Sequence, residues 1–266
     1  MIISQITSGL GNQLFQYAAA RRLAYVHKVP LKLDLSWFNY CNYREYGLKY
    51  FNIVENIAST GEIEDVKRQN HFQERSFSFN PEIKDIKPSV YLSGYWQSEK
   101  YFQDIAEIIR REFTLKYQPD ESNMQMTGFI QRYESASLHI RRTDYLSNPN
   151  HGVVSLEYYH EAVNYLINII ANAHFFIFSD DWQWVRENLR LKYPSTLITL
   201  NSAAVGYLDL YLMSLCKHHI IANSTFSWWG AWLSQYPNKI VIVPQKWFHA
   251  LPYDTRDLIP ESWRVM

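Results

Sequence analysis

The chain has 266 residues, of which 47% are hydrophobic and 20% charged, and its formal net charge is zero. This length suits one large domain or two modest ones, and the composition is that of a globular protein rather than a disordered or fibrous one. Because non-specific nucleic-acid binders carry an excess of basic residues, the balanced charge argues against nucleic acid as a partner.

The chain opens with a short apolar strand that runs into a glycine-containing turn. Residues 2–6 supply the strand, 8–13 break it, and a helix-forming run covers 14–28. Strand, glycine turn and helix are the opening unit of a doubly wound sheet. The glycines match neither the dinucleotide fingerprint nor the phosphate loop. Backbone N–H groups at such a helix start can reach a ligand, but the loop alone favours a tight turn that needs positive φ.

The remainder of the first half is less regular. Residues 30–35 alternate like a second strand, and residues 89–94 form another before a helical segment. Between them, residues 37–79 are rich in Tyr, Asn and Phe without a clean period, which indicates loops and short helices. Tyr95 and Trp96 follow a strand directly, and aromatic rings at such a position either line a sugar site or cap the core.

A polar stretch without an apolar pattern covers residues 119–127, and we expect it to link two halves. The predicted domains are therefore residues 1–126 and 127–266. In the second half strand and helix patterns alternate clearly, which predicts an α/β fold with a parallel, Rossmann-type sheet. The expected strands cover residues 138–141, 175–178, 197–200, 220–222 and 240–243.

Three polar clusters follow strands of this second sheet. They are Arg141, Arg142 and Asp144; Asp180 and Asp181; and Asn223, Ser224, Thr225, Phe226 and Ser227. Since the carboxyl ends of parallel strands meet at one edge of a sheet, we expect the clusters to lie close together. Two guanidiniums at a strand end make a good anion clamp, although solvated loop cations are the alternative.

The other two clusters each have several interpretations. Residues 223–227 are typical of a helix N-cap, and opposite an arginine pair they become the second half of a pyrophosphate cradle. Asp180 and Asp181 fit a helix N-cap, a metal-ligand pair, or acceptors for ribose hydroxyls or a guanine edge. Without a further ligand signature the metal case is weak, so we expect neither a metal nor a cofactor.

Cysteine usage and the N-terminus bear on location. Cys41 and Cys216 lie far apart without metal-ligand spacing, which predicts two reduced thiols, with Cys216 buried in an apolar run. The first residues lack the basic region and long apolar stretch of a signal peptide, and no window approaches the length of a membrane span. We therefore expect a cytoplasmic protein without a transmembrane segment, with peripheral contact to the inner membrane left open.

Four sequence blocks together resemble one known family. They are GLGNQLFQYA at 9–18, HIRRTD at 139–144, FSDD at 178–181 and STFSWWGAW at 224–232. In this order they are similar to the α-1,2-fucosyltransferase family, glycosyltransferase family 11, and they span nearly the whole chain. The first and last blocks are highly specific, whereas the His-x-Arg-Arg core is shared with α-1,6- and protein O-fucosyltransferases. One departure is Thr7-Ser8, where the family more often carries a further glycine.

The resemblance implies a GT-B-like fold, in which an acceptor-side N-terminal Rossmann-like domain and a GDP-fucose-binding C-terminal one face each other across a cleft. It also implies an inverting, metal-independent transfer of fucose to the 2-hydroxyl of a β-galactoside in an O-antigen, lipopolysaccharide or capsule glycan. The expected partners are therefore GDP-fucose, as donor substrate, and a galactose-terminated oligosaccharide.

Particular residues follow as candidates for the chemistry. Arg141 is expected to stabilise the charge that grows on the departing phosphate, with Arg142 either helping or buttressing the strand end. The attacking hydroxyl must lose a proton to a carboxylate or a His, for which Asp144 is the nearest candidate, with His151 and Glu157 as alternates. Asp144 could instead bind fucose hydroxyls or orient an arginine.

Substrate contacts are expected in both halves of the chain. His139 lies within a strand, which favours packing and strand-end hydrogen bonding over proton transfer. Two alternatives to α-1,2-fucosyl transfer stay open: a fucosyltransferase of another linkage or acceptor, and a non-catalytic GDP-sugar or glycan-binding module. The predicted substrate-binding residues are Gly9, Gly11, Asn12, Gln13, His139, Arg142, Asp180, Asp181, Asn223, Ser224, Thr225, Phe226 and Ser227.

Overall fold

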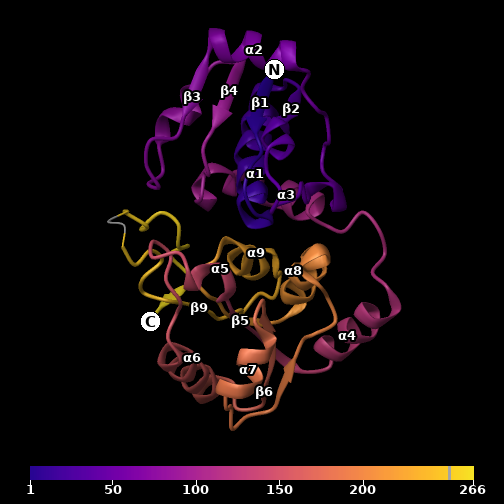
Figure 1. Ribbon diagram of the computed structural model, residues 1–266, viewed down its shortest axis with the longest axis vertical. Coiled ribbons are helices and arrows are strands. Elements are labelled where there is room, and N and C mark those ends of the chain that lie inside the picture. Colours follow the sequence, from indigo (N-terminus) through magenta and orange to yellow (C-terminus); the bar gives the residue numbers. More distant parts are fainter. Residues whose placement is uncertain (251–252) are drawn as a thin grey trace. The chain divides into compact units, whose positions relative to one another are not determined.

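The computed structural model describes residues 1–250 and 253–266, and the chain divides into two compact α/β units (Figure 1). Unit 1 comprises Met1–Tyr117 and Tyr253–Pro260, and unit 2 comprises Gln118–Pro252 and Glu261–Met266. Each unit has its own parallel sheet with helices packed against it. The predicted α/β class with two Rossmann-like domains is confirmed.

Unit 1 is built on four parallel strands in the order β2-β1-β4-β3. Helix α2 covers one face, where Val66 packs with Ile3 and Tyr91. The next residue of β1, Ser4, points to the opposite face and donates its hydroxyl hydrogen to a carbonyl of α1 at 3.2 Å. The elements are β1 (Ile2–Gln5), α1 (Leu10–His27), β2 (Leu31–Asp34), η1 (Ser36–Asn39), η2 (Leu48–Tyr50), α2 (Thr60–Gln69), β3 (His71–Gln73), η3 (Pro81–Asp85), β4 (Val90–Ser93), η4 (Glu99–Tyr101), η5 (Gln103–Ile105) and α3 (Ala106–Glu112).

Two expectations for unit 1 are corrected. Helix α1 begins at Leu10 rather than at Leu14, so the glycine motif forms its first turn. The predicted positive-φ glycine turn is wrong, because Gly9 is extended (φ −75°) and the left-handed residue is Ser8 (φ 66°). Residues 37–79 hold short helices as expected, but also β3, whose three residues are too few to show a period.

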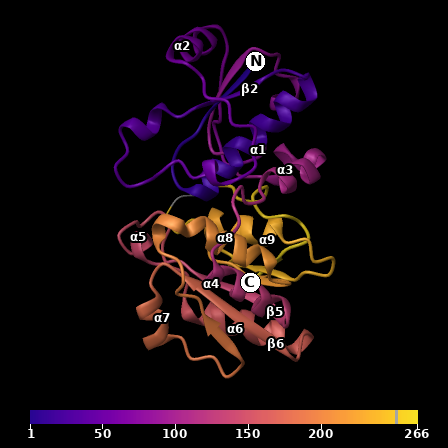
Figure 2. The same ribbon diagram turned by 90° about the vertical axis from the view of Figure 1, so that its right-hand side faces the viewer.

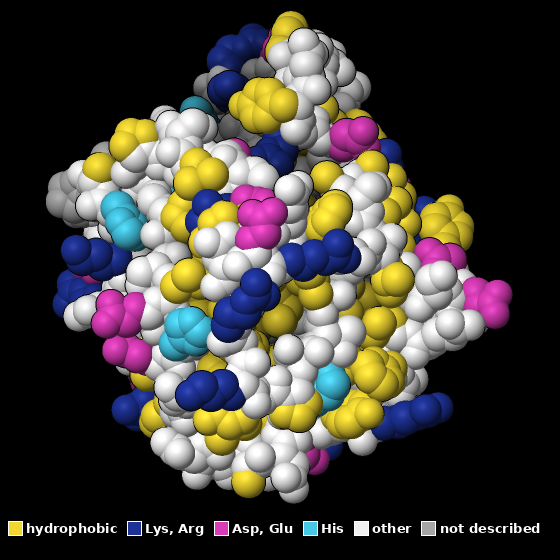
Figure 3. Space-filling view, turned by 60° about the horizontal axis from the view of Figure 1, so that its bottom comes forward, with side chains coloured by type: hydrophobic (Ala, Val, Ile, Leu, Met, Phe, Trp, Pro, Cys, Tyr) yellow, Lys and Arg dark blue, Asp and Glu magenta, His cyan; other side chains and the backbone are white. Residues whose placement is uncertain are grey.

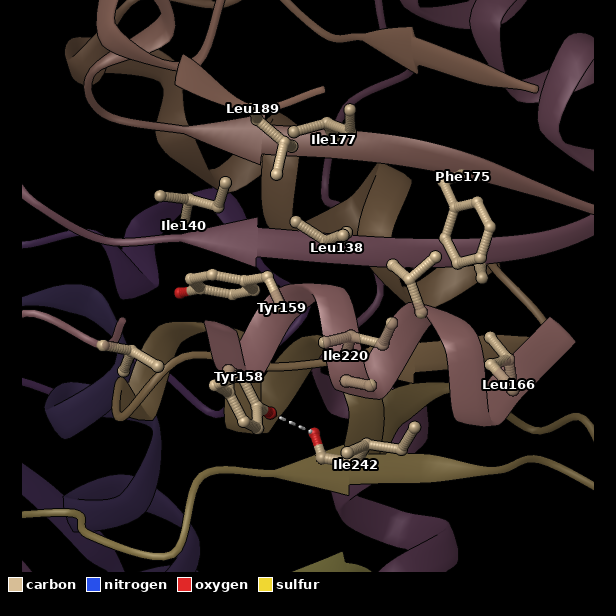
Figure 4. Packing of buried hydrophobic residues seen from close by; sticks show 14 of the residues in the cluster. Leu138, Ile140, Tyr158, Tyr159, Leu166, Phe175, Ile177, Leu189, Ile220 and Ile242 are labelled. Atoms are coloured by element: carbon tan, nitrogen blue, oxygen red, sulfur yellow. Dashed lines mark hydrogen bonds between the residues drawn. The ribbon is translucent and has the colours of Figure 1, made fainter. Parts of the chain in front are cut away.

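Unit 2 is built on six parallel strands in the order β10-β9-β8-β5-β6-β7. Along β6 the side chains alternate: Phe175 and Ile177 join the cluster under α6, whereas Phe176 and Phe178 join the one under α4 and α8 (Figure 4 shows the α6 side). Helices α8 and α9 pack side by side (Figure 2). The elements are α4 (Glu121–Gln131), β5 (Glu134–Ile140), α5 (Thr143–Leu146), α6 (Leu156–Ile169), β6 (Ala173–Ser179), α7 (Trp182–Asn188), β7 (Ser195–Leu197), η6 (Ala203–Val205), α8 (Gly206–Leu215), β8 (His218–Ile220), α9 (Thr225–Leu233), β9 (Val241–Val243) and β10 (Arg264–Val265).

The polar stretch at 119–127 is not a linker. It forms most of α4, which Asp120 caps by accepting a hydrogen bond from the Asn123 amide at 2.9 Å. The first unit ends at Tyr117, so the predicted boundary between residues 126 and 127 falls inside this helix, and residues 253–260 return to unit 1. The linker prediction failed because α4 buries only one side, at Asn123 and Ile130, so its sequence is mostly polar.

A buried tyrosine fastens the core of unit 2. The Tyr158 hydroxyl donates to the carbonyls of Ile221 at 2.8 Å and Ile242 at 3.1 Å, the second bond being drawn in Figure 4. These carbonyls belong to neighbouring strand segments, so one side chain from α6 holds the carboxyl end of the sheet. That edge is where the polar clusters lie.

The surface and the cysteines agree with the composition. On the face shown in Figure 3, Lys and Arg side chains lie among hydrophobic and acidic ones, as zero net charge predicts. Neither cysteine forms a disulfide, and Cys216 is buried as expected. Within the described part of the chain, no helix is both long and apolar enough to cross a bilayer.

Candidate active site

The three polar clusters of unit 2 follow adjacent strands. Strand β5 pairs in parallel with β6 on one side and β8 on the other, so their carboxyl ends share one edge of the sheet. The expected convergence of the arginines, the aspartates and the 223–227 run at this edge is therefore confirmed. The edge carries fixed charges of both signs beside the start of α9.

Arg141 is held by two carboxylates. Its Nη2 lies 2.6 Å from Asp144 Oδ1 and its Nη1 lies 3.1 Å from Asp180 Oδ2, while the guanidinium sits 5.4 Å from the centroid of the Tyr145 ring. The side chain remains 21% exposed. The guanidinium is thus fixed in direction and still open to a ligand.

Arg142 takes a different direction. Its guanidinium lies 3.6 Å from the centroid of the Trp184 ring, and its Nε donates to Asp181 Oδ2 at 3.2 Å. Both partners belong to α7 or its cap. Of the two roles left open for Arg142, these contacts favour buttressing the strand end over sharing an anion with Arg141.

The two aspartates after β6 organise the loop after β5. Asp180 accepts hydrogen bonds from the backbone amides of Arg142 at 2.9 Å and Thr143 at 3.1 Å, and from the Thr143 hydroxyl. Asp181 accepts from the Trp184 amide at 3.1 Å and caps α7, which confirms one of the interpretations considered for it. Among residues 1–250 and 253–266, no group of three or more His, Cys, Asp or Glu is placed to hold a metal ion.

The start of α9 is capped as the sequence predicted. The Ser224 hydroxyl accepts from the Phe226 amide at 3.3 Å, and the Ser227 hydroxyl donates to the Ser224 carbonyl at 3.3 Å. Asn223 is buried and donates its amide hydrogens to the carbonyls of His151, Gly152 and Trp247 at 2.9, 3.2 and 3.1 Å. Asn223 therefore holds the surrounding loops in place. Of residues 223–227, only Thr225 and Phe226 are partly exposed and open to a ligand.

Two histidines, His139 and His151, lie at this edge of the sheet. His139 is 4% exposed, its ring lies 5.8 Å from Phe226, and burial lowers its pKa to about 4. This supports packing rather than proton transfer. His151 stacks on Tyr145 with ring centroids 4.7 Å apart, and burial lowers its pKa as well.

Tyr145 is a site residue that sequence reasoning missed. Its hydroxyl donates to the Asn223 carbonyl at 3.3 Å, and its ring is a neighbour of both the Arg141 guanidinium and the His151 ring. Burial raises its pKa to about 12. Its four-residue helix is too short to show a periodic signal, so only its position three residues after the arginine pair could have marked it.

The predicted contacts of the first block all lie in unit 1, at the start of α1. The buried Gln13 donates to the carbonyls of Ser8 and Glu45 and accepts from the Gly47 amide, each at 2.8 Å, so it fixes the loop after β2. Asn12 is half-buried and accepts from Gln97 at 3.0 Å. An added Cβ at Gly9 would meet no atom within 4 Å, and Gly11 is buried.

Two Rossmann-like units, one with an arginine-bearing strand end beside a capped helix start, define a GT-B-like glycosyltransferase. The chain belongs to glycosyltransferase family 11, because that family's model matches residues 62–263. It is 34% identical to an α-1,2-colitosyltransferase of Escherichia coli over 99% of this chain and 98% of the relative. It is also 34% identical to the O-antigen biosynthesis glycosyltransferase WbnK of Escherichia coli, over 92% and 94%. The family predicted from the motifs is confirmed.

Comparison with solved structures agrees on the fold. The chain is similar to NodZ α-1,6-fucosyltransferase soaked with GDP-fucose, with a TM-score of 0.51 and 17% identity over 91% of this chain and 94% of that one. It is also similar to a mutant of Arabidopsis thaliana FUT1 in complex with GDP, with a TM-score of 0.51 and 12% identity over 90% and 69%. At these identities the likeness concerns the fold alone.

Proposed function

We propose that the chain transfers fucose from GDP-fucose to the 2-hydroxyl of a β-galactoside unit in a surface glycan, with inversion and without a metal ion. The observation that carries this proposal is the fixed guanidinium of Arg141 at the carboxyl end of β5. The neighbouring strand β8 leads into the start of α9 at the same edge of the sheet. Family membership and the O-antigen relative support the reaction class and the kind of product.

The geometry suits a diphosphate leaving group. As the bond to fucose breaks, negative charge grows on the phosphate, and a preorganised donor aimed at that charge lowers the barrier. Asp144 and Asp180 hold Arg141 in one orientation, so little reorganisation is needed during the reaction. The N-terminal end of α9 adds a favourable dipole for the same anion.

Asp144 is proposed as the base that takes the proton of the acceptor hydroxyl. It is about half exposed and already paired with Arg141 at 2.6 Å, so it lies beside the group proposed to bind the leaving phosphate. If Asp144 is the base, Asp144→Asn lowers kcat by about 10²–10⁴ and removes the limb of the pH–rate profile on which kcat rises with pH. An unchanged limb and rate at saturating acceptor would clear Asp144 of this role, leaving His151 or Glu157.

The test of the whole proposal is the release of fucose from GDP-fucose with and without lactose. Formation of fucosyl-lactose supports it. Release without transfer to lactose would indicate a different acceptor or linkage, and GDP binding with no release under either condition would indicate a binding module.

A second donor deserves a direct comparison, because one of the relatives that is 34% identical is named for colitose transfer. Colitose is fucose without one ring hydroxyl. A site that hydrogen-bonds that hydroxyl rejects the analogue by roughly 10⁴-fold, whereas a site lined by apolar groups discriminates only about 10- to 200-fold. Values of kcat/KM for GDP-fucose and GDP-colitose therefore decide which sugar the chain is built for.

A further inference from the structure

The carboxyl edge of the unit 1 sheet carries a second group of side chains. Because β3 and β4 are parallel neighbours, Glu74 after β3 and residues 94–97 after β4 meet at that edge. None of them has a part in the donor chemistry proposed above. The group contains the Glu74 carboxylate, the exposed ring of Tyr95 and the buried side-chain amide of Gln97.

Glu74 fixes the backbone after β4. Its Oε2 accepts from the Tyr95 amide at 2.6 Å and its Oε1 from the Trp96 amide at 3.0 Å, and no Lys or Arg pairs with it among the described residues. A Cβ at Gly94 would lie 2.4 Å from Glu74 Cβ, so the close approach requires glycine there. Trp96 is left-handed at φ 56° and fully buried. Glu74 therefore sets the directions in which Tyr95 and Gln97 leave the backbone.

Three rings make an aromatic platform, composed of Phe77, Tyr95 and Tyr253. The Phe77 and Tyr95 rings are stacked, 6.1 Å apart with an interplanar angle of 9°, and the Phe77 and Tyr253 rings lie 4.7 Å apart. Tyr95 is 38% exposed and Tyr253 45%. Mutual packing holds the rings in place while leaving part of their surface open to a ligand.

Gln97 carries an unused acceptor two residues after Tyr95. Its side chain is 5% exposed, and its Nε2 donates to Asn12 Oδ1 at 3.0 Å. Its Oε1 is buried and has no hydrogen-bond partner among the described residues. A buried acceptor without a partner destabilises the fold, and a hydrogen bond donated by a ligand hydroxyl would remove that cost.

We propose that the aromatic platform and Gln97 bind the galactoside ring of the acceptor. A pyranose presents one face of C–H groups, which packs on aromatic rings, and hydroxyls at its rim, which reach polar groups. Tyr95 and Gln97 are two residues apart, so their Cα atoms lie within about 7 Å, the span of one such ring. This inference rests on the proposed function for the choice of a galactoside. Glu74 is a positioning residue in it.

Lactose kinetics test the subsite. Tyr95→Ala is expected to raise the KM for lactose about tenfold, while the KM for GDP-fucose and its hydrolysis without acceptor stay within about twofold. Tyr95→Phe keeps the ring and should match the wild type. Gln97→Met should raise the lactose KM about three- to tenfold. Tyr117→Ala removes another exposed tyrosine of unit 1, 68% exposed, and serves as the control.

Several outcomes would overturn the subsite. An unchanged lactose KM in Tyr95→Ala, or Tyr95→Phe as impaired as Tyr95→Ala, excludes stacking on this ring. If Tyr95→Ala does not fold, Tyr253→Ala removes the other exposed ring and carries the same expectation.

The proposed function is wrong if the wild type does not use GDP-fucose at all, and this outcome is independent of the galactoside subsite. Saturation-transfer NMR with lactose then still tests the subsite, since it needs no turnover. A signal lost in Tyr95→Ala and kept in Tyr95→Phe supports it, whereas an equal signal in both, or none in the wild type, sinks it.

Discussion

The carboxyl edges of the two sheets differ in the kind of side chain that they carry. In unit 2, Arg141 and the two carboxylates that hold it form a paired cluster, and Arg142 is paired in turn with Asp181. In unit 1, among the described residues, Glu74 has only backbone amides as partners, Gln97 keeps an acceptor without a partner, and aromatic rings are exposed. Both sheets are parallel, so the difference comes from the side chains that follow the strands. Fixed charge suits an anion, whereas rings with one amide suit a neutral sugar.

The largest expected effect concerns Arg141. Arg141→Ala should lower kcat for transfer from GDP-fucose by roughly 10²–10³, because one preorganised donor to the departing phosphate is lost. Arg141→Lys should rescue poorly, since a point charge cannot replace the guanidinium fork between Asp144 and Asp180. Steady-state kinetics measure both, with the exposed Arg68→Ala as a control. Near-normal turnover by Arg141→Lys would rule out the clamp.

The next effect contrasts the buried amides of the two units. Asn223 donates to three carbonyls, so Asn223→Asp would place a carboxylate against acceptors and cost about 3 kcal/mol of unfolding free energy. Gln97→Met removes one hydrogen bond to Asn12 and an acceptor that has no partner among the described residues, and should cost only about 1 kcal/mol. Chemical denaturation at constant pH compares them. Equal losses would mean that the Gln97 oxygen is satisfied in solution, which weakens its assignment as a ligand contact.

The sequence predicted the unit 2 edge better than the unit 1 edge, for physical reasons. Buried strands such as β6 are continuous apolar runs followed by polar residues, so Asp180 and the arginines were placed by pattern alone. Strand β3 has three residues and only one partly buried side chain, at Phe72, so nothing marked Glu74 as a strand-end residue. Arg141 is directed by its contact with Asp144, and Arg142 by its contact with Trp184. Only the folded chain creates these contacts.

A substitution of Arg142 tests whether the two arginines that follow β5 have separate tasks. Arg142→Ala should lower the unfolding free energy by about 1–2 kcal/mol, because the partly buried guanidinium stacks on Trp184 and pairs with Asp181. Its kcat should fall far less than that of Arg141→Ala. Denaturation and kinetics on the same preparations separate the two quantities. A kcat loss as large as that of Arg141→Ala would show that both arginines act on the phosphate.

The last effect is a pH dependence of stability that belongs to unit 1. Burial raises the pKa of Glu74 from 4.5 to about 7, against the opposing effect of the two backbone N–H groups. Between these values the folded chain holds the proton more tightly than the unfolded chain, so stability falls as the pH rises through this window.

Glu74→Gln has no proton to lose and should flatten this slope by about 2–3 kcal/mol between about pH 5 and 8. His71 lies on the same strand and has a lowered pKa, but it titrates in both proteins and cancels in their difference. Denaturation at several pH values gives both curves. Parallel curves would mean that Glu74 is ionised throughout, and that its carboxylate is stabilised by more than the Tyr95 and Trp96 amides.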